Sequence, residues 1–441
     1  MNFTKIFFLS LVTITVNIFY TNAQLWETEI IASLPAARSN NVVETAVVDG
    51  VPYVYSFSGI DTTKVWSGIS NKAYRYNTET AVWDTIPNLP MNINVIAAGA
   101  STVGNKIYII GGYTVLQNNN EISSNQIFEY DPIANSYTEK TNLPIPIDDH
   151  IQSVWRDSLI YVVTGWSNTT NISNVQIYDP ANDTWTIGTS VPNNSDYKVF
   201  GGSGAFIGDT LYYAGGTGIV GFNFNLVPFF RKGVVNPANP AELMWSIEEN
   251  DLALGYRMGV TTFEDQVLWI GGSLVSYNYD GIAYNGSGGV PPTDRILSYS
   301  PTTGVLTDSP ALIPPTMDLR GIAKIKEGIY YVIGGMTEDQ TVSDQCFILR
   351  DATVLEGLFS VKQQNLEVYQ TLASHEIKII LPEEINTQKA QLRILTTEGK
   401  VVLQQKINTT TALSTIGWTT GIYAVSVSDG ERYWSRKIVH E

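Results

Sequence analysis

The amino-acid sequence predicts an all-β chain: a six-bladed β-propeller followed by a small C-terminal antiparallel β-sandwich domain. Three observations predict this fold: a short strand that ends in glycine recurs six times, a turn signature follows most copies, and a lone strand stands near the N-terminus. The copies recur every 50 to 60 residues or so, close to the roughly 50-residue period of some propeller blades. Their final glycines are Gly59, Gly112, Gly165, Gly216, Gly272 and Gly335.

The repeated strand is rich in β-branched and aromatic residues, as in IYIIGG at 107–112 and VLWIGG at 267–272. Such runs are typical of strands. Glycine allows a close backbone approach and unusual dihedral angles where the strand leaves the crowded axis of a propeller. We therefore expect each copy to be the second strand of one blade.

A second signature follows each copy except the last. It is clearest where Tyr130-Asp131-Pro132 precedes an aromatic residue, Tyr137, and a Leu-Pro pair at 143–144. Together the two patterns resemble the kelch repeat, a propeller class that galactose oxidase shares. The resemblance spans nearly all of residues 25–350 and implies blades of four antiparallel strands.

The two ends of the repeat region are expected to complete one blade. The sixth copy stops at Arg350 without an outer strand, whereas residues 25–35 (LWETEIIASLP) read as an outer strand standing alone. Closing the ring in this way removes the free sheet edges that an open array would expose to aggregation.

The N-terminus has the three-part layout of a secretory signal peptide over residues 1–23: Lys5, an apolar run, and small residues before Gln24. The apolar run is shorter than the roughly 20 residues that a membrane helix needs, and nothing comparable follows. We expect an exported chain without a transmembrane segment, with a propeller at 24–350, a linker at 351–362 and a last domain at 363–441.

The last domain shows alternating strands and two Gly-containing turns, a pattern that predicts a small antiparallel sandwich. Its motifs EGKVV at 398–402, GIY at 421–423 and KIV at 437–439 resemble the C-terminal sorting domain of the type IX secretion system. The usual Pro-Asn-Pro opening of that family is absent, and VYQTL at 368–372 stands there instead. The resemblance implies contact with the outer-membrane type IX machinery and a secreted or cell-surface location. A generic stabilising domain is the alternative.

Charge argues against nucleic acid as a partner. The formal net charge is -16, from 42 acidic and 26 basic residues, and nearly all of the excess precedes residue 363. Such a field repels nucleic acid and anionic membrane surfaces. The single cysteine, Cys346, lies in a strand-like run and is expected to be buried, and no intrachain disulfide is possible.

Chemistry is expected on the face where the loops leading into the first strands and the loops joining second to third strands open, here called the loop face. Counting back equally from each final glycine gives one position per blade: Glu44, Ala97, His150, Gly201, Arg257 and Arg320. Neighbouring loop residues would widen this ring: Arg38, Asn94, Asp148, Asp149, Tyr197, Lys198, Tyr256 and Asp318.

Two arginines that face one cavity suit a carboxylate ligand, because the guanidinium fork binds it bidentately. Glu44 and His150 would then be available as acid or base. The alternative is that Arg257 and Arg320 are structural bridges between blades through carbonyls or acids.

Aromatic residues offer further candidates. Tyr277 and Tyr279, with Tyr284 nearby, occupy the long loop at 273–295, where they suit either sugar contact or packing on the rim. A phenylalanine run, Phe222, Phe224, Phe229 and Phe230, is expected in the third strand of blade four and in the core.

The leading hypothesis is a secreted or cell-surface propeller that binds an extracellular glycan or protein. The alternative is a carbohydrate-active enzyme resembling kelch-type N-acetylneuraminate epimerase, a mutarotase; whether there is catalysis stays open. Copper radical oxidation of the galactose oxidase kind is not expected, since His375 and His440 fall in the last domain and His150 stands alone. No metal site or cofactor is expected, because no zinc spacing or phosphate-binding loop is present. Calcium binding stays open, since scattered Asp and Asn residues could supply ligands although they form no recognisable ligand loop.

Overall fold

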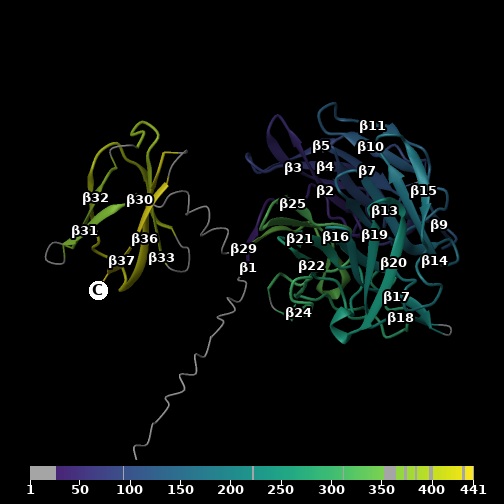
Figure 1. Cartoon of the computed structure of the whole chain (residues 1–441). Helices are drawn as coiled ribbons and strands as arrows, with labels where there is room; N and C mark the ends of the chain where they lie inside the picture. Colours follow the sequence, from purple (N-terminus) through teal and green to yellow (C-terminus); the bar gives the residue numbers. More distant parts are fainter. Residues whose placement is uncertain are drawn as a thin grey trace, which may run out of the picture.

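The computed structural model describes residues 26–440 apart from 93, 221–222, 311, 352–363, 372–374, 383–384, 397–400 and 430–432. The predicted signal peptide and all but residue 351 of the predicted linker lie outside these residues, as do the expected turns at 398–399 and 430. Figure 1 shows the propeller strands in purple to green and the last domain in yellow-green.

The fold is all-β, as predicted: within the described residues, six antiparallel sheets form the blades (Figure 1). Blades one and two are β2 (Val42–Val48), β3 (Val51–Phe57), β4 (Ala73–Asn77) and β5 (Val82–Ile86), then β6 (Gly99–Val103), β7 (Lys106–Ile110), β10 (Ile127–Asp131) and β11 (Ser136–Glu139). Blades three and four are β12 (Ile151–Trp155), β13 (Leu159–Ser167), β14 (Thr170–Asp179) and β15 (Thr184–Gly188), then β16 (Phe200–Ile207), β17 (Thr210–Val220), β19 (Phe229–Asn236) and β20 (Asn239–Glu249). Blades five and six are β21 (Gly259–Phe263), β22 (Gln266–Ile270), β23 (Ile296–Ser300) and β24 (Val305–Ser309), then β25 (Ala323–Lys326), β26 (Ile329–Ile333), β29 (Cys346–Asp351) and β1 (Trp26–Ile30).

Burial follows strand position within each blade. The second strand β7 reads KIYII and is buried in its last four residues, because neighbouring blades cover both faces of it. The outer strand β11 is mostly exposed, whereas the first strand β6 alternates between buried and half-buried residues. The core therefore lies between blades, and the first strands line the axis.

Glycine is required where the second strand ends. Gly111 and Gly112 have φ of 68° and 88°, and a Cβ on each would lie 2.4 Å from the Ile147 carbonyl oxygen and 2.7 Å from that of Ile96. Backbone of two other loops thus approaches too closely for any side chain. This close approach holds the loop face together and explains the recurring Gly-Gly pair.

Blade six takes its outer strand from the N-terminal end of the described chain. β1 pairs antiparallel with β29, from Trp26 opposite Asp351 to Ile30 opposite Phe347. The indole of Trp26 packs 5.5 Å from the ring of Phe263 in blade five. β1 thereby covers the edge of β29, the last strand of the repeat region. Cys346 of β29 is a free, buried cysteine.

Short strands and 3-10 turns lie on the loop face. They are the hairpin β8 (Tyr113–Val115) with β9 (Glu121–Ser123), the strand β18 (Asn223–Leu226), the pair β27 (Met336–Thr337) and β28 (Thr341–Val342), and the 3-10 turns η1 (Trp66–Gly68), η2 (Asp251–Ala253) and η3 (Glu338–Gln340).

The prediction for the phenylalanine run was wrong in part. β17 continues beyond Gly216 and pairs with β18, so Phe224 lies in a hairpin on the loop face and the third strand β19 begins only at Phe229. Phe222 lies outside the described residues. The sequence pattern missed the hairpin because apolar residues continue without a turn signal.

The last domain has two antiparallel-dominated sheets. One contains β30 (Gln364–Asn365), β33 (Gln391–Thr396), β34 (Val401–Lys406), β36 (Gly421–Ser428) and β37 (Tyr433–His440), and the other contains β31 (Glu367–Thr371), β32 (Glu376–Ile380) and β35 (Thr411–Ser414). Apolar side chains from both sheets, such as Ile377, Ile379, Ile394 and Val425, share one core. This is the small β-domain predicted from the alternating pattern.

Candidate functional site

A ring of backbone hydrogen bonds surrounds the axis on the loop face. The amide of Asp149 donates to the Ala97 carbonyl (3.1 Å), that of Gly201 to Asp149 (2.8 Å), and that of Arg257 to Gly201 (2.8 Å). In the same way, the amide of Leu319 donates to the Arg257 carbonyl and the amide of Asn40 to the Asp318 carbonyl. One residue per blade in this ring has a positive φ: Asn40, Ala97, Asp149, Gly201, Arg257 and Asp318.

This ring overlaps only partly with the positions counted from the glycines. Asn40, Asp149 and Asp318 stand where counting placed Glu44, His150 and Arg320. The cause is hairpin length: β2 and β3 have seven residues each, whereas β6 and β7 have five. Longer first hairpins move the ring residue further from the glycine.

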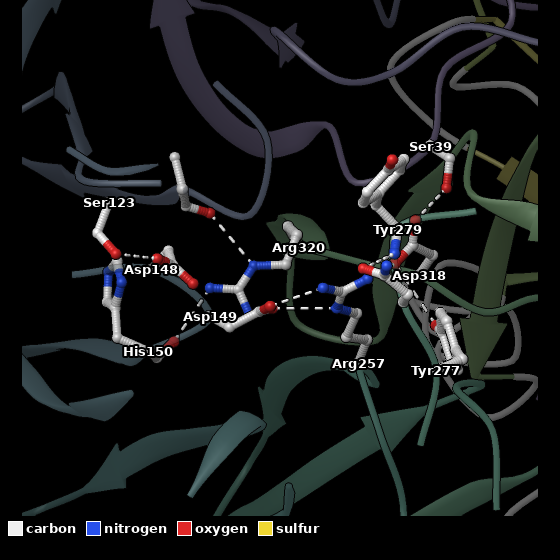
Figure 2. A network of polar contacts seen from close by, with 12 residues as sticks. Ser39, Ser123, Asp148, Asp149, His150, Arg257, Tyr277, Tyr279, Asp318 and Arg320 are labelled. Carbon is white, nitrogen blue, oxygen red and sulfur yellow. Dashed lines mark hydrogen bonds and ion pairs between the residues drawn. The ribbon is translucent and has the colours of Figure 1, made fainter. Parts of the chain in front are cut away.

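Arg257 bridges two carboxylates at the centre of the ring. Its Nη2 lies 2.6 Å and its Nε 3.1 Å from Asp149, and Nη1 lies 2.9 Å from Oδ1 of Asp318 (Figure 2). A Cβ on Gly201 of the intervening blade would lie 2.2 Å from the ring of Tyr256, so glycine leaves room for this ring. The guanidinium also lies 5.2 Å from the Tyr256 ring and 5.5 Å from the Tyr277 ring. The bidentate pairing and the aromatic faces fix the group in place.

Arg320 crosses the axis from blade six. Its Nη2 donates to the His150 carbonyl (3.0 Å) and its Nε to the Ala98 carbonyl (3.2 Å), while Nη1 lies 3.6 Å from Asp149. Asp149 therefore lies between both arginines (Figure 2). Two nitrogens of Arg320 thus donate to backbone carbonyls of other blades and the third lies near a carboxylate, as expected for a bridge between blades.

Burial and charge shape the ionisation of this cluster. Burial works to lower the pKa of Arg257, but Asp149 and the other acidic neighbours raise it well above its usual value. Burial also raises the pKa of Asp318, against the lowering effect of Arg257 and of the hydrogen bond from Ser39. The pKa of Asp148 is raised well above its usual value by burial and by the charge of Asp149. Its Oδ2 accepts a hydrogen bond from the Ser123 hydroxyl at 2.5 Å.

His150 is not an acid–base group at neutral pH. The imidazole is 1% exposed, and burial together with the charge of Arg320 lowers its pKa to about 3. Its Nε2 lies 2.9 Å from Oε1 of Gln152. The side chain is thus a neutral, buried element of the channel wall.

Arg257 and Arg320, with Asp149 and Asp318, form a layer across the axis, here called the arginine layer. It separates two hollows on the axis. On the loop face lies a small pocket of about 60 Å³, here called the loop pocket, with these lining residues: Tyr113, Glu121, Asp148, Asp149, Trp166, Phe200, Phe224, Arg257 and Tyr284. On the other side, a cavity of about 500 Å³ runs along the first strands to Lys326, and we call it the axial cavity. Glu44, His150 and Arg320 line the axial cavity, and the two hollows share no lining residue.

Aromatic rings from three segments meet at the loop pocket. Trp166 of β13 lies 5.5 Å from Phe224 of β18, and Phe224 lies 4.9 Å from Tyr284 of the long loop. All three side chains are half-buried, while Phe200 behind them is buried and 5.3 Å from Trp166. The pocket therefore combines aromatic walls with the carboxylates of Asp148 and Asp149.

The remaining predicted residues lie apart from both hollows. Arg38 donates to the Ala37 carbonyl, and Tyr197 is buried in the core between blades three and four. Tyr279 packs against the apolar cluster around Ile60 and Ile96. Tyr277 is fully buried behind Arg257, with its hydroxyl 3.5 Å from Oδ1 of Asp318. The structure thus brings together Arg257, Arg320, Tyr277 and His150, with Glu44 deeper in the channel.

Sequence reasoning missed Tyr113, Glu121 and Trp166. A signal was present: Tyr113 and Trp166 each follow directly after the final glycine of their blade. Both pair with the loop that leads into the first strand, at Ile96 and Asp148. Counting forward from the glycines would have found Tyr113 and Trp166, but not Glu121 of β9.

Within the described ranges, no group of three or more His, Cys, Asp and Glu side chains is arranged to hold a metal ion. Among the same residues, none of the helices is long and apolar enough to cross a membrane.

Comparison with known proteins supports the repeat and the last domain separately. A kelch motif model matches residues 97–144 and 156–192, and a secretion system C-terminal sorting domain model matches residues 372–441. β30 and β31 precede residue 372, where the sorting-domain match begins, yet they pair with strands inside that match.

Curated relatives match parts of the propeller. Kelch-like protein terF of Aspergillus terreus is 26% identical over 145 residues, which is 30% of each chain. Kelch repeat and BTB domain-containing protein 13 of Homo sapiens is 30% identical over 145 residues, 31% of this chain and 30% of that protein. The chain therefore spans under a third of the length of these relatives.

A solved structure shares the fold. The protein described as "Structure of YjhT" aligns with 80% of this chain and 97% of its own, with a TM-score of 0.56 and 13% sequence identity. At that identity the likeness concerns architecture alone.

Proposed function

Because the chain is a kelch-repeat β-propeller with a type IX secretion C-terminal sorting domain, we propose that it is a binding protein whose loop face takes up an extracellular glycan. The sorting domain indicates a secreted or cell-surface location and an interaction with the type IX machinery. The observation that carries the proposal is the loop pocket, where Trp166, Phe224 and Tyr284 surround buried carboxylates.

Aromatic rings beside hydrogen-bond acceptors suit a sugar. The ring faces pack against the C–H groups of a pyranose, and the exposed Glu121 in the pocket lining offers carboxyl oxygens that accept hydrogen bonds from its hydroxyl groups. Trp166, Phe224 and Tyr284 come from three different segments and stay half-buried, so each keeps surface available to a ligand. Below them, the bonds of Arg257 to Asp149 and Asp318 give the pocket a rigid floor.

The same geometry supports an acidic-sugar epimerase less well. Such an enzyme needs a cation for the substrate carboxylate and a group that exchanges protons near neutral pH. The pKa of His150 lies at about 3, whereas burial raises that of Glu44 in the axial cavity to about 7, so Glu44 could exchange protons. What the geometry does not supply is an arginine free of protein partners, because Arg257 and Arg320 are already engaged by carboxylates and carbonyls. NMR of sialic acid anomer exchange with and without the protein distinguishes the two functions, since only the epimerase accelerates exchange.

The proposal is tested by glycan-array binding of the full chain lacking residues 1–23. We expect at least tenfold weaker binding for Trp166→Ala and for Phe224→Ala, since a central aromatic contact contributes about 2 kcal/mol or more. Tyr369→Ala is the matched control, because this exposed tyrosine lies in the sorting domain. Absence of any glycan ligand, or binding that Trp166→Ala leaves intact, would overturn the assignment. A protein ligand that depends on Trp166 would replace the glycan on the same face.

A further inference from the structure

We propose that the axial cavity is a second, independent binding site, for a small uncharged molecule rich in hydroxyl groups, such as a monosaccharide. It lies on the other side of the arginine layer from the loop pocket. The inference therefore does not rest on glycan binding at the loop face.

The space for such a ligand comes from small residues on the first strands. Gly99, Ala100, Gly202 and Gly204 all line the cavity, which has a volume of about 500 Å³. Volumes of this order are typical of sites for small molecules. Arg320 forms the roof, so a ligand would enter from the far end, near the exposed Lys326.

The roof offers little to a charged ligand. The guanidinium of Arg320 is bonded to the Ala98 and His150 carbonyls and lies 3.6 Å from the carboxylate of Asp149, which offsets its charge. Near the other end, the ammonium group of Lys324 lies 3.0 Å from the Thr262 carbonyl oxygen and 2.8 Å from Glu327. An anion would therefore have to displace existing bonds at Arg320 and at Lys324, and the remaining lysine of the lining, Lys326, is exposed to solvent.

The walls offer groups that both donate and accept hydrogen bonds. The amide of Gln152 is oriented by His150 at its oxygen (2.9 Å) and by the Ser101 hydroxyl at its nitrogen (3.0 Å). The hydroxyls of Thr102 and Thr262 also lie on the wall. Hydroxyl and amide groups match the alternating donors and acceptors of a sugar. Because Phe206 is the one phenyl, phenol or indole side chain among the lining residues, the cavity lacks the stacking surfaces that a planar aromatic ligand would use.

Glu44 supplies a carboxyl group whose charge changes near neutrality. Burial raises its pKa to about 7, and its Oε1 accepts a hydrogen bond from the Thr45 amide (2.9 Å). The ionised carboxylate is the stronger acceptor for a sugar hydroxyl. Affinity should therefore rise as the pH rises through 7, a dependence that a purely structural role would not produce.

Saturation-transfer NMR on the full chain lacking residues 1–23 tests the site, with D-glucose, D-galactose, D-mannose and N-acetyl-D-glucosamine as probes. We expect transfer to at least one sugar, and an affinity that increases at least threefold between pH 6 and pH 8. Glu44→Gln should weaken binding about tenfold and abolish the pH dependence. The control Glu79→Gln changes an exposed turn residue and should behave as the unaltered protein.

Trp166→Ala separates this site from the loop face. Binding in the axial cavity should survive that change, whereas binding at the loop pocket should not. The inference is overturned if none of the four sugars gives transfer, because the cavity then holds only solvent. It is equally overturned if Glu44→Gln keeps the affinity and the pH profile, or if Trp166→Ala abolishes the signal.

Discussion

The two sides of the arginine layer show opposite uses of polar groups inside one propeller. At the layer itself, Arg257 and Arg320 meet Asp149 and Asp318 in a closed set of bonds. In the axial cavity, Glu44 lies in a space of about 500 Å³ and bonds within the protein to its own neighbour, Thr45. Satisfied charges hold the blades together, whereas polar groups that face a cavity remain available to a ligand.

This contrast bears on the role of the two arginines, Arg257 and Arg320. Residue type and position alone left two alternatives open, guanidinium groups directed at a ligand or bridges between blades. The structure gives both groups partners from other blades, so they connect distant parts of the ring. Buried charges of this kind lose much more when one partner is removed than the intact bridge contributes.

The largest expected effect is that of Arg257→Met. The change leaves Asp149 and Asp318 buried without their main counter-charge, so we expect the free energy of unfolding of the propeller to fall by about 3–5 kcal/mol. Denaturant unfolding followed by tryptophan fluorescence measures it.

A double-mutant cycle with Asp318→Asn provides the control. If the cluster is a structural bridge, the double variant should lose less stability than the sum of the single variants, because the introduced amide carries no charge that needs Arg257. A loss below about 1 kcal/mol in Arg257→Met would contradict the bridge. It would return Arg257 to the set of ligand-binding candidates.

A smaller effect is expected for Arg320→Met. Its main partners are the neutral carbonyls of Ala98 and His150, and Asp149 keeps its bonds to Arg257. Leaving two buried carbonyls without donors should cost about 1–3 kcal/mol in unfolding free energy. The same denaturation experiment ranks the two arginines, and equal losses would show that the charge of Asp149 is shared evenly between them.

The repeat could be read from the sequence because its signals are local. Strand patterns report on backbone conformation within one blade, and glycines such as Gly111 and Gly112 recur at the end of each second strand. The all-β propeller with a C-terminal β-domain was predicted from them. The sorting motifs were equally local, and the match over residues 372–441 confirms that prediction.

The site could not be read in the same way, because it depends on lengths and on distant partners. Four extra residues in the first hairpin of blade one move Asn40, rather than Glu44, into the ring. The reach of Arg257 past Gly201 to Asp149 joins residues more than a hundred positions apart. Neither fact leaves a trace in the spacing of the glycines.

The smallest expected effect comes from the hydroxyl of Ser203, which lines the axial cavity on β16. Its Oγ is buried and finds no hydrogen-bond partner among the described residues, whereas Oγ of Ser101, also in the cavity lining, accepts from Gln152 at 3.0 Å. A buried hydroxyl without a partner loses its hydration on folding and gains nothing in return. We therefore expect Ser203→Ala to match the unaltered protein in unfolding free energy or to exceed it by up to about 1 kcal/mol. Ser101→Ala, the matched control, should lose about 1 kcal/mol because it removes a bond that orients the amide of Gln152. If Ser203→Ala loses as much as Ser101→Ala in the same denaturation experiment, then the Ser203 hydroxyl has a partner in solution, and the cavity wall at blade four is as well hydrogen-bonded as the wall at Ser101 in blade two.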